Sequence, residues 1–219
     1  MESKSANIPP AEKTMAVCIR NGVPIREEPR KEGKRISSMN LGETAYYYGQ
    51  TAIDTAHTPG KYYKLELSDG TLQWVSSSAI IINAKPAAVM TESPVWVRPA
   101  HVTKTDKSFK RAEFLVIISE KNEWAEVIGA ENRKKGWIQK SALSTKVEDA
   151  SIAALAQIEL LDKNGDIQID KISGFLKDIP YPDARLAILL QNLLNEQIES
   201  AIEESIMEYE EQAISEEEI

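Results

Sequence analysis

The sequence is poor in the residues that catalytic and metal chemistry most often use. It has one cysteine, Cys18, and two histidines, His57 and His101, among 219 residues. A single cysteine excludes a disulfide within the chain and any zinc site built from several cysteines. Neither histidine lies in a recognisable nucleophile–base pattern, and no glycine-rich phosphate loop is present. We therefore expect a protein that is not an enzyme.

Long apolar runs are also missing. No run approaches the ~20 residues that span a bilayer, so we expect no transmembrane segment. Small residues before Cys18 raise the hypothesis of a lipoprotein, but no hydrophobic segment precedes it. The Val17–Ile19 pattern instead favours a cysteine within a buried strand. Residues 1–14 are polar and contain prolines, so we interpret them as a flexible tether, of the kind that follows a removed export leader.

Basic residues become scarce along the chain. Up to Thr145 there are 21 basic and 16 acidic residues, whereas from Lys146 on there are 5 basic and 18 acidic. None follows Arg185. The short clusters at 30–35 and 133–135 are typical of solvated turn tips. Because no concentrated basic stripe is present, we expect no binding to nucleic acid.

Two stretches repeat one order of short apolar and aromatic runs. The second copy contains Val95–Pro99, Phe114–Ile118, Trp124–Val127 and Lys135–Leu143. The first copy contains Val23–Pro29, Ala45–Tyr48, Tyr62–Leu67 and Asp69–Ile80. Such runs, bounded by Gly, Asn and Asp, predict short β-strands, and a small all-β domain loses its exposed edges by closing into a barrel.

Aligning the copies predicts which positions correspond. The alignment pairs Arg26 with Arg98, Tyr63 with Trp124 and Trp74 with Trp137. We expect Trp74 and Trp137 to be largely buried, each against the strand of its own copy that carries the arginine. Asp69-Gly70 predicts a two-residue hairpin turn. The first copy also has an insertion, Gln50–Lys61, whose composition predicts a lengthened loop at a hairpin tip.

These motifs resemble the bacterial SH3-like domain. In the second copy the matching residues are Val97-Arg98, Trp124, Gly136–Ile138 and Ser141–Leu143. In the first copy they are Ile25-Arg26, Leu41–Glu43, Tyr63, Trp74-Val75 and Ser78–Ile80. Gln73, Pro99 and Arg111–Glu113 depart from the family pattern. The resemblance implies a mainly β plus α chain with two tandem small SH3-like β-barrels, at 15–84 and 85–145, followed by an acidic helical region, 146–219.

The acidic region has helical periodicity. Helices are predicted for Asp149–Leu161, for Lys171–Asp178 and from Asp183 towards Gln212, with Asn164-Gly165 ending the first. Apolar residues recur three and four apart along the third helix. We expect them to form a seam that docks the helices on the second barrel. The seam consists of Ile188, Leu189, Leu190, Leu193, Leu194, Ile198 and Ile202. Packing on the two shorter helices, and pairing with a second copy to give a homo-oligomer, are the alternatives.

One loop resembles the calcium loop of an EF-hand. Oxygen-bearing side chains stand at alternate positions in Asp162, Asn164 and Asp166, with Asp170 further on. Such spacing can turn the oxygens onto one cation. Ile167 replaces the usual glycine, however, and Ser173 replaces the usual bidentate Glu. The alternative to a calcium site is a helix stop at Asn164-Gly165, with Asp170 as the N-cap of the next helix. In that case we expect the protein to bind no cofactor.

Exposed aromatic rings are the candidate ligand contacts. Consecutive tyrosines in a strand must place at least one ring outward, and SH3-like grooves use exposed aromatics. The candidates are Tyr46, Tyr48, Tyr62 and Trp96. The resemblance implies a non-catalytic binding protein of the bacterial cell envelope that recognises a peptide, peptidoglycan or a protein. The alternatives are a cytoplasmic location and a structural or assembly protein whose helices make the contacts.

Overall fold

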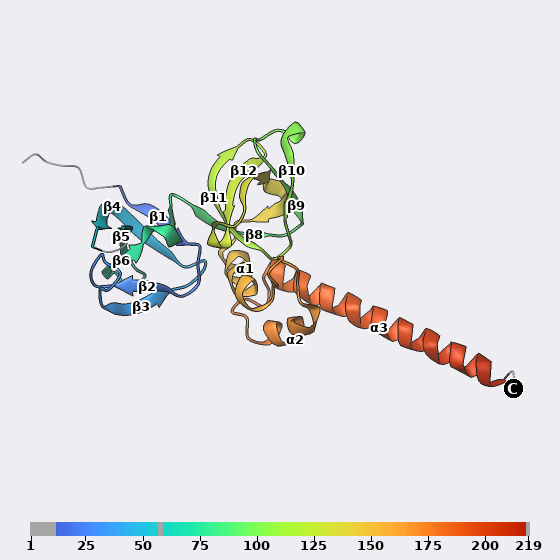
Figure 1. The fold of residues 1–219 in the computed structure, drawn as a ribbon. Helices are drawn as coiled ribbons and strands as arrows, with labels where there is room; N and C mark the ends of the chain where they lie inside the picture. Colours follow the sequence, from blue (N-terminus) through green and yellow to red (C-terminus); the bar gives the residue numbers. More distant parts are fainter. Residues whose placement is uncertain (1–11, 57–58, 218–219) are drawn as a thin grey trace, which may run out of the picture.

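The chain forms two β-sheets in succession, followed by three helices (Figure 1). The computed structural model describes residues 12–56 and 59–217, with side chains described as far as Met207. The mixed β and α class expected from the sequence is confirmed, as is the order of sheets before helices.

The first sheet has seven strands in the order β3-β2-β6-β5-β4-β1-β7, and all of its neighbouring pairs are antiparallel. Its strands are β1 (Thr14–Cys18), β2 (Val23–Arg26), β3 (Arg35–Met39), β4 (Thr44–Asp54), β5 (Gly60–Glu66), β6 (Leu72–Ser76) and β7 (Ile80–Ile82). Asp69 and Gly70 do lie in the hairpin turn between β5 and β6, but the predicted length is wrong: Leu67 pairs with Thr71, so the turn has three residues, 68–70, and not two. Gly70 has φ +81°, and Asp69 accepts a hydrogen bond from the Thr71 amide at 2.9 Å.

The second sheet repeats this arrangement in the order β10-β9-β13-β12-β11-β8-β14. Its strands are β8 (Lys85–Val89), β9 (Ser93–Trp96), β10 (Lys104–Phe109), β11 (Phe114–Lys121), β12 (Trp124–Gly129), β13 (Lys135–Gln139) and β14 (Leu143–Ser144). Each position in this order is held by the strand seven places further along the chain. The two sheets therefore share one topology.

At the arginines, the strand pairing in the structure differs from the sequence alignment of the two copies. Arg26 in β2 lies opposite Trp74 in β6, and Trp96 in β9 lies opposite Trp137 in β13. The two partner tryptophans keep their predicted equivalence. Arg26 therefore corresponds to Trp96, and its predicted equivalence with Arg98 is wrong.

The sequence alignment of β5, which contains Tyr62 and Tyr63, with β12 is wrong by one residue. Lys64 in β5 and Glu126 in β12 lie opposite the equivalent tryptophans of β6 and β13. Tyr62, not Tyr63, therefore corresponds to Trp124, and both are buried. A one-residue slip moves a strand side chain to the other face of the sheet. Tyr63 packs with the core of the first sheet, whereas Tyr62 lies on the opposite face.

The expected burial of Trp74 and Trp137 is met only in part, since each keeps a minority of its surface exposed. Both are only half-buried, whereas the next residue in each strand, Val75 or Ile138, is completely buried in its sheet core. Adjacent residues in a strand point to opposite faces, so a valine or isoleucine turned inward forces its tryptophan neighbour outward.

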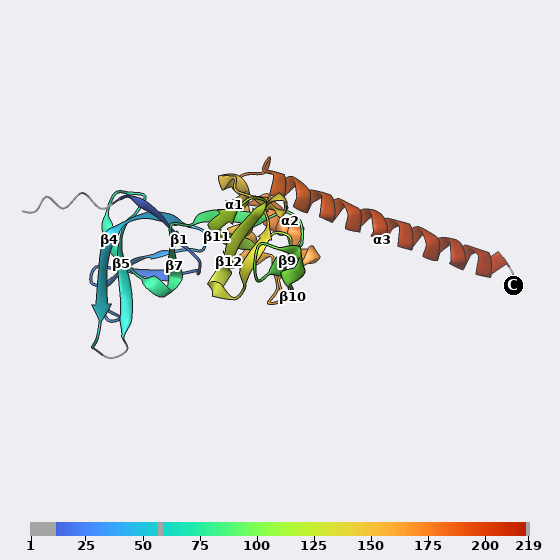
Figure 2. The same ribbon diagram turned by 90° about the horizontal axis from the view of Figure 1, so that it is seen from above.

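The insertion of the first copy is mostly strand. β4 continues to Asp54 and β5 begins at Gly60, so the segment predicted as a loop lengthens a hairpin that projects from the sheet (Figure 2). His57, in this insertion, lies outside the described residues.

Three apolar cores hold the fold together. One lies in each sheet, and the third and largest joins both sheets to the helices. Helix α1 (Val147–Glu159) packs on β8 and β11. The turn at Gly42 approaches α1 so closely that an added Cβ would lie 2.8 Å from the Ala154 Cβ. Glycine is required there by this contact and by its φ of +84°.

The two remaining helices are α2 (Ile169–Lys177) and α3 (Arg185–Glu217), so the prediction of three helices is confirmed. Asp149 of α1, 0% exposed, joins them to the second sheet. Its Oδ1 accepts a 2.8 Å hydrogen bond from the Leu186 amide in the first turn of α3, and its Oδ2 accepts one of 2.5 Å from the Ser144 hydroxyl. A carboxylate at a helix N-terminus satisfies an amide that has no partner within the helix.

The predicted apolar seam of α3 holds for only its first turns. Leu190 is buried and Leu189, Leu193 and Leu194 pack against the third core, together with Leu186 and Ala187. Ile188, Ile198 and Ile202 are exposed, and α3 runs away from the rest of the molecule (Figures 1 and 2). The helices reach the second sheet through α1, so α3 has no sheet beside its outer half. No described helix has the length and apolar character needed to cross a membrane.

Candidate functional site

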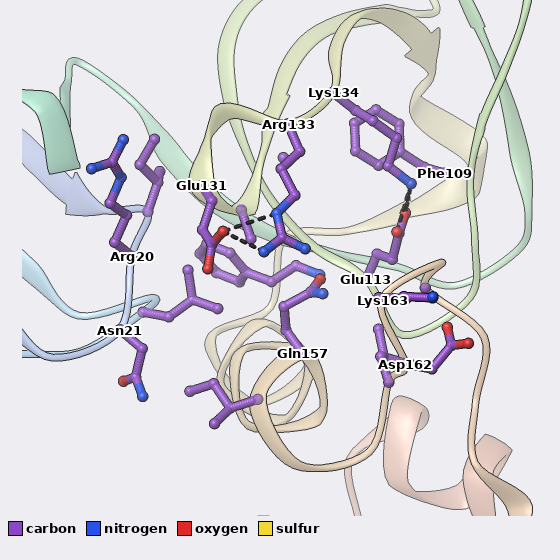
Figure 3. A pocket seen from close by; sticks show the side chains of 18 of the residues that line it. Arg20, Asn21, Phe109, Glu113, Glu131, Arg133, Lys134, Gln157, Asp162 and Lys163 are labelled. Atoms are coloured by element: carbon purple, nitrogen blue, oxygen red, sulfur yellow. Dashed lines mark hydrogen bonds and ion pairs between the residues drawn. The ribbon is translucent and has the colours of Figure 1, made fainter.

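A cleft of about 550 Å³ lies where the two sheets and α1 meet (Figure 3). Three structural units form it: the first sheet through its β1–β2 and β3–β4 turns, the second sheet through its β10–β11 and β12–β13 turns, and the C-terminal end of α1 with the loop that follows. Its volume falls in the range of small-ligand sites, which often lie between structural units. Because no single part contains the cleft, the site exists only when all three are assembled.

The floor of the cleft is apolar. Ile19, Leu41, Phe114 and Leu161 line it, and each also belongs to the core that joins the sheets to the helices. Ile158, on the outward face of α1, is 42% exposed at the edge. The four floor side chains are nearly completely buried, so Ile158 presents the exposed apolar surface that a ligand could cover.

A buried ion pair fixes one wall. The Lys134 ammonium lies 2.5 and 2.6 Å from the two Glu113 carboxylate oxygens and donates a 3.0 Å hydrogen bond to the Ser108 carbonyl. It also lies 4.8 Å from the centre of the Phe109 ring. The Lys110 amide donates to the same carboxylate at 2.9 Å. Both charged groups have their partners, so this pair serves to position the β12–β13 turn.

The β12–β13 turn contacts the first sheet. Its amide at Glu131 donates a 2.7 Å hydrogen bond to the Ile19 carbonyl, across the junction. Glu131 and Asn132 have φ values of +56° and +58°, a conformation that costs non-glycine residues energy and is held in place here by its surroundings. The Glu131 carboxylate pairs with Arg133. Glu131 thus holds the turn through two interactions, its amide with Ile19 and its carboxylate with Arg133. Figure 3 shows the second.

Two cations at the rim have no anionic partner. Arg20 lies at the end of β1 and Lys163 in the loop after α1, on opposite sides of the cleft (Figure 3). Both are exposed, and neither forms an ion pair with any side chain in the described part of the chain. The other cations of the wall, Arg133 and Lys134, are already paired. The unpaired positive charge therefore stands above an apolar floor.

Of the predicted aromatic candidates, Tyr46 and Tyr48 lie together on the outer face of β4. Tyr46 is 38% exposed, so the expected outward ring is present. The Lys13 ammonium lies 3.8 Å from the centre of that ring. The Tyr48 hydroxyl donates a hydrogen bond to Glu66, which raises the pKa of the tyrosine. These rings already have partners in the chain and lie away from the cleft.

Tyr62 and Trp96 lie elsewhere and are buried, unlike the exposed rings expected of candidates. Burial raises the pKa of Tyr62. Trp96 packs edge-to-face on Trp124, with ring centres 4.8 Å apart, and its indole donates a 3.3 Å hydrogen bond to the His101 carbonyl. The structure does not bring the four candidates together in one groove. Whether any of them contacts a ligand stays a prediction.

The Asp162 loop is closed by its own hydrogen bonds. Asp162 Oδ1 accepts from the Asn164 and Asp166 amides, both at 2.8 Å, which lowers the pKa of the Asp162 carboxyl. Asp166 pairs with Lys110 at 2.5 Å. In the described residues no group of three or more His, Cys, Asp or Glu side chains is placed to hold a metal ion. Gln168, not Asp170, is the N-cap of α2, which corrects the alternative assigned to that loop. Calcium binding stays a prediction.

Sequence reasoning missed the cleft because its walls come from distant segments. The only local signal was the basic run at 133–135, interpreted as a solvated turn tip. Lys134 is instead half-buried in its ion pair, while its neighbours Arg133 and Lys135 are exposed.

Comparisons with known proteins leave the family open. No protein-family model and no curated protein matches the sequence. Two solved structures from Trichomonas vaginalis match weakly. NlpC2 is 11% identical over 63% of this chain and 50% of its own, with a TM-score of 0.27. NlpC1 is 13% identical over 67% and 51%, also with a TM-score of 0.27. The chain therefore spans about half the length of these structures, and at this TM-score the likeness carries no argument about function.

Proposed function

We propose that this chain is a non-catalytic binding protein whose junction cleft takes a carboxylate-bearing peptide, such as a peptidoglycan stem peptide. The observation that carries the proposal is the cleft itself, with an apolar floor and two rim cations, Arg20 and Lys163, that form no ion pair with the described side chains. A carboxylate would supply the missing negative charge, and an aliphatic side chain of the ligand would cover Ile158 at the edge of the floor.

The proposal includes the fold family. We assign the two sheets as tandem SH3-like barrels, supported by their shared strand order and by the equivalent places of Trp74 and Trp137 in it. The bacterial SH3-like resemblance of these motifs is the reason to name a peptide or cell-wall ligand. It is also the reason to place the protein in the cell envelope, with the cytoplasm as the alternative that fractionation would test.

A binding role also fits the nucleophiles that are described. Burial raises the pKa of the Cys18 thiol to about 11, so it is un-ionised at neutral pH. His101 contacts the rings of Trp96 and Trp124 and lies outside the cleft lining. Neither group is placed to act on a ligand in the cleft.

Calorimetric titration of the full chain tests the proposal. The probe is a synthetic stem-type tetrapeptide with free carboxylates, and its control is the same peptide with those carboxylates amidated. We expect the free acid to bind more tightly. Arg20→Gln and Lys163→Gln should each weaken binding about fivefold, because an exposed charge pair contributes up to ~1 kcal/mol.

Lys171→Gln is the matched control variant. It removes an equally exposed lysine from α2, outside the cleft lining, and should leave the affinity unchanged. The proposal fails if neither peptide binds, if the amidated peptide binds equally well, or if Lys171→Gln weakens binding as much as the two cleft variants. An assembly role is favoured by a different observation, the uncovered half of α3.

A further inference from the structure

The outer half of α3 has no partner within the described chain. From Asn195 to Met207 every side chain is exposed, and Figures 1 and 2 show the helix extending alone beyond α1 and α2. Three isoleucines are among these residues: Ile198 is 49%, Ile202 53% and Ile206 51% exposed. Exposed apolar residues scattered singly are ordinary, but a regular row of them is the mark of a contact surface.

The isoleucines form one face. Residues four apart on an α-helix lie one above another, so Ile198, Ile202 and Ile206 make a continuous stripe. Leu194, one step earlier, packs against the core that joins the sheets and helices, so the stripe continues an interface already in use. The row thus runs from the covered part of α3 onto its uncovered part without a break.

The two edges of the stripe differ. By helical position, Ala201 and Ser205 border it on one side, where small side chains allow another helix to approach closely. Glu199 and Glu203 border it on the other side. An apolar row with charged flanks is the arrangement by which one helix selects another through charges along the seam.

Charge decides which helix fits. From Leu186 to Ile219 the sequence has ten glutamates and no lysine or arginine. Two copies of α3 paired along the stripe would bring like charges together with no basic residue to offset them, which is destabilising. A helix with lysine or arginine beside its own apolar row would instead meet Glu199 and Glu203 with opposite charge.

We infer that the Ile198–Ile202–Ile206 face of α3 is a docking site for a basic amphipathic helix of another protein. The isoleucines bury the apolar row of the partner, and the Glu199–Glu203 edge sets its orientation and excludes acidic helices, this chain included. The inference is independent of the cleft, which lies at the other end of the helical region.

Peptide binding to the full chain tests this inference. The probes are three synthetic helices of equal length: one with a leucine row flanked by lysines, one with the same row flanked by glutamates, and one with the lysines but alanine in place of leucine. We expect only the first to bind in a fluorescence anisotropy titration, with an affinity that falls as salt rises. Sedimentation velocity of the chain alone should show a monomer.

The variants separate the stripe from the rest of the helix. Ile198→Asp and Ile202→Asp should each weaken binding of the first peptide about tenfold or more. Ser200→Asp is the matched control: Ser200 is exposed on the opposite face of α3, away from both the stripe and its glutamate edge, so binding should persist. Glu199→Lys combined with Glu203→Lys should reverse the preference, so that the glutamate-flanked peptide binds. Circular dichroism checks that each variant keeps its helix.

Four results would overturn the inference. One is self-association of the chain through the stripe, since the occupant would then be a second copy. Another is the absence of binding by every peptide. The third is equal binding of the lysine-flanked and glutamate-flanked helices, and the fourth is an equal loss of binding in Ile202→Asp and Ser200→Asp.

Discussion

Asp149 connects the helical region to the second sheet, and its removal should be costly. The side chain is fully buried and accepts hydrogen bonds from the Leu186 amide and the Ser144 hydroxyl, at 2.8 and 2.5 Å. Asp149→Ala leaves both donors buried without a partner. An unsatisfied buried donor costs ~1–3 kcal/mol, and loss of a helix cap costs ~0.5–2 kcal/mol, so we expect a loss of about 3 kcal/mol in the free energy of unfolding.

The assay is urea unfolding followed by far-UV circular dichroism, which reports mainly on the helices. Glu148→Ala is the matched control, since Glu148 is acidic, belongs to the same first turn of α1 and is exposed. It should change the free energy of unfolding by less than ~0.5 kcal/mol. Asp149→Asn keeps one acceptor oxygen and should fall between the two. If Asp149→Ala and Glu148→Ala unfold at the same urea concentration, the role assigned to Asp149 is wrong.

Three further predictions follow from burial. Trp124→Ala should destabilise the protein by about 3–5 kcal/mol, whereas the half-buried Trp137 should cost about half as much when replaced by alanine; equal midpoints in urea would contradict the strand register. Because burial raises the pKa of Cys18 to about 11, above the ~8.5 of an unfolded thiol, the stability it confers is fully present below that unfolded value and is lost as pH rises towards the folded one. The Cys18 thiol of the folded protein should therefore resist a thiol reagent at pH 8, and rapid labelling without unfolding would show that the thiol is accessible. The free energy of unfolding of the parent, relative to that of Cys18→Ala, should fall as pH rises over that alkaline range. A chain ending at Asn195 should melt like the parent, because the lost residues whose side chains the structure describes are all exposed, whereas one ending at Pro182 should melt lower, because Leu186 and Leu190 leave the core.

Local signals in the sequence predicted the elements well. Asp69 and Gly70 lie in a hairpin turn, and α1 ends before Asn164-Gly165, where Gly165 has φ +80°. Turn residues and helical periodicity act over a few neighbouring positions, so one segment contains the information. The repeated succession of motifs also predicted that the two stretches fold alike, and the two sheets do share one strand order.

Which face of a strand turns inward was harder to predict. Tyr62-Tyr63 and Trp137-Ile138 are pairs in which both side chains suit a core, so alternation alone allows two phases that differ by one residue. The pairing of β5 with β6, and of β12 with β13, selects one phase. Register is set by the partner strand, which a single segment does not reveal.

The cleft and the free half of α3 depend on tertiary structure. Arg20 and Lys163 are far apart in the sequence, and only the packing of the first sheet beside α1 places them around one cavity. The apolar row of α3 was correctly read as helical, but periodicity shows only that a face is apolar, not what covers it. Here the first turns are covered by the chain and the later ones are exposed.

A chemical-shift titration of the isotope-labelled full chain with the free-acid tetrapeptide tests the central proposal most directly. The account predicts that shifts concentrate around the cleft, at Arg20, Asn21, the Glu131–Arg133 turn, Gln157 and Lys163, and that the amidated peptide at the same concentration moves these signals less. Shifts confined to the face of Tyr46 and Tyr48 or to Trp96, or no shifts at all, would contradict it.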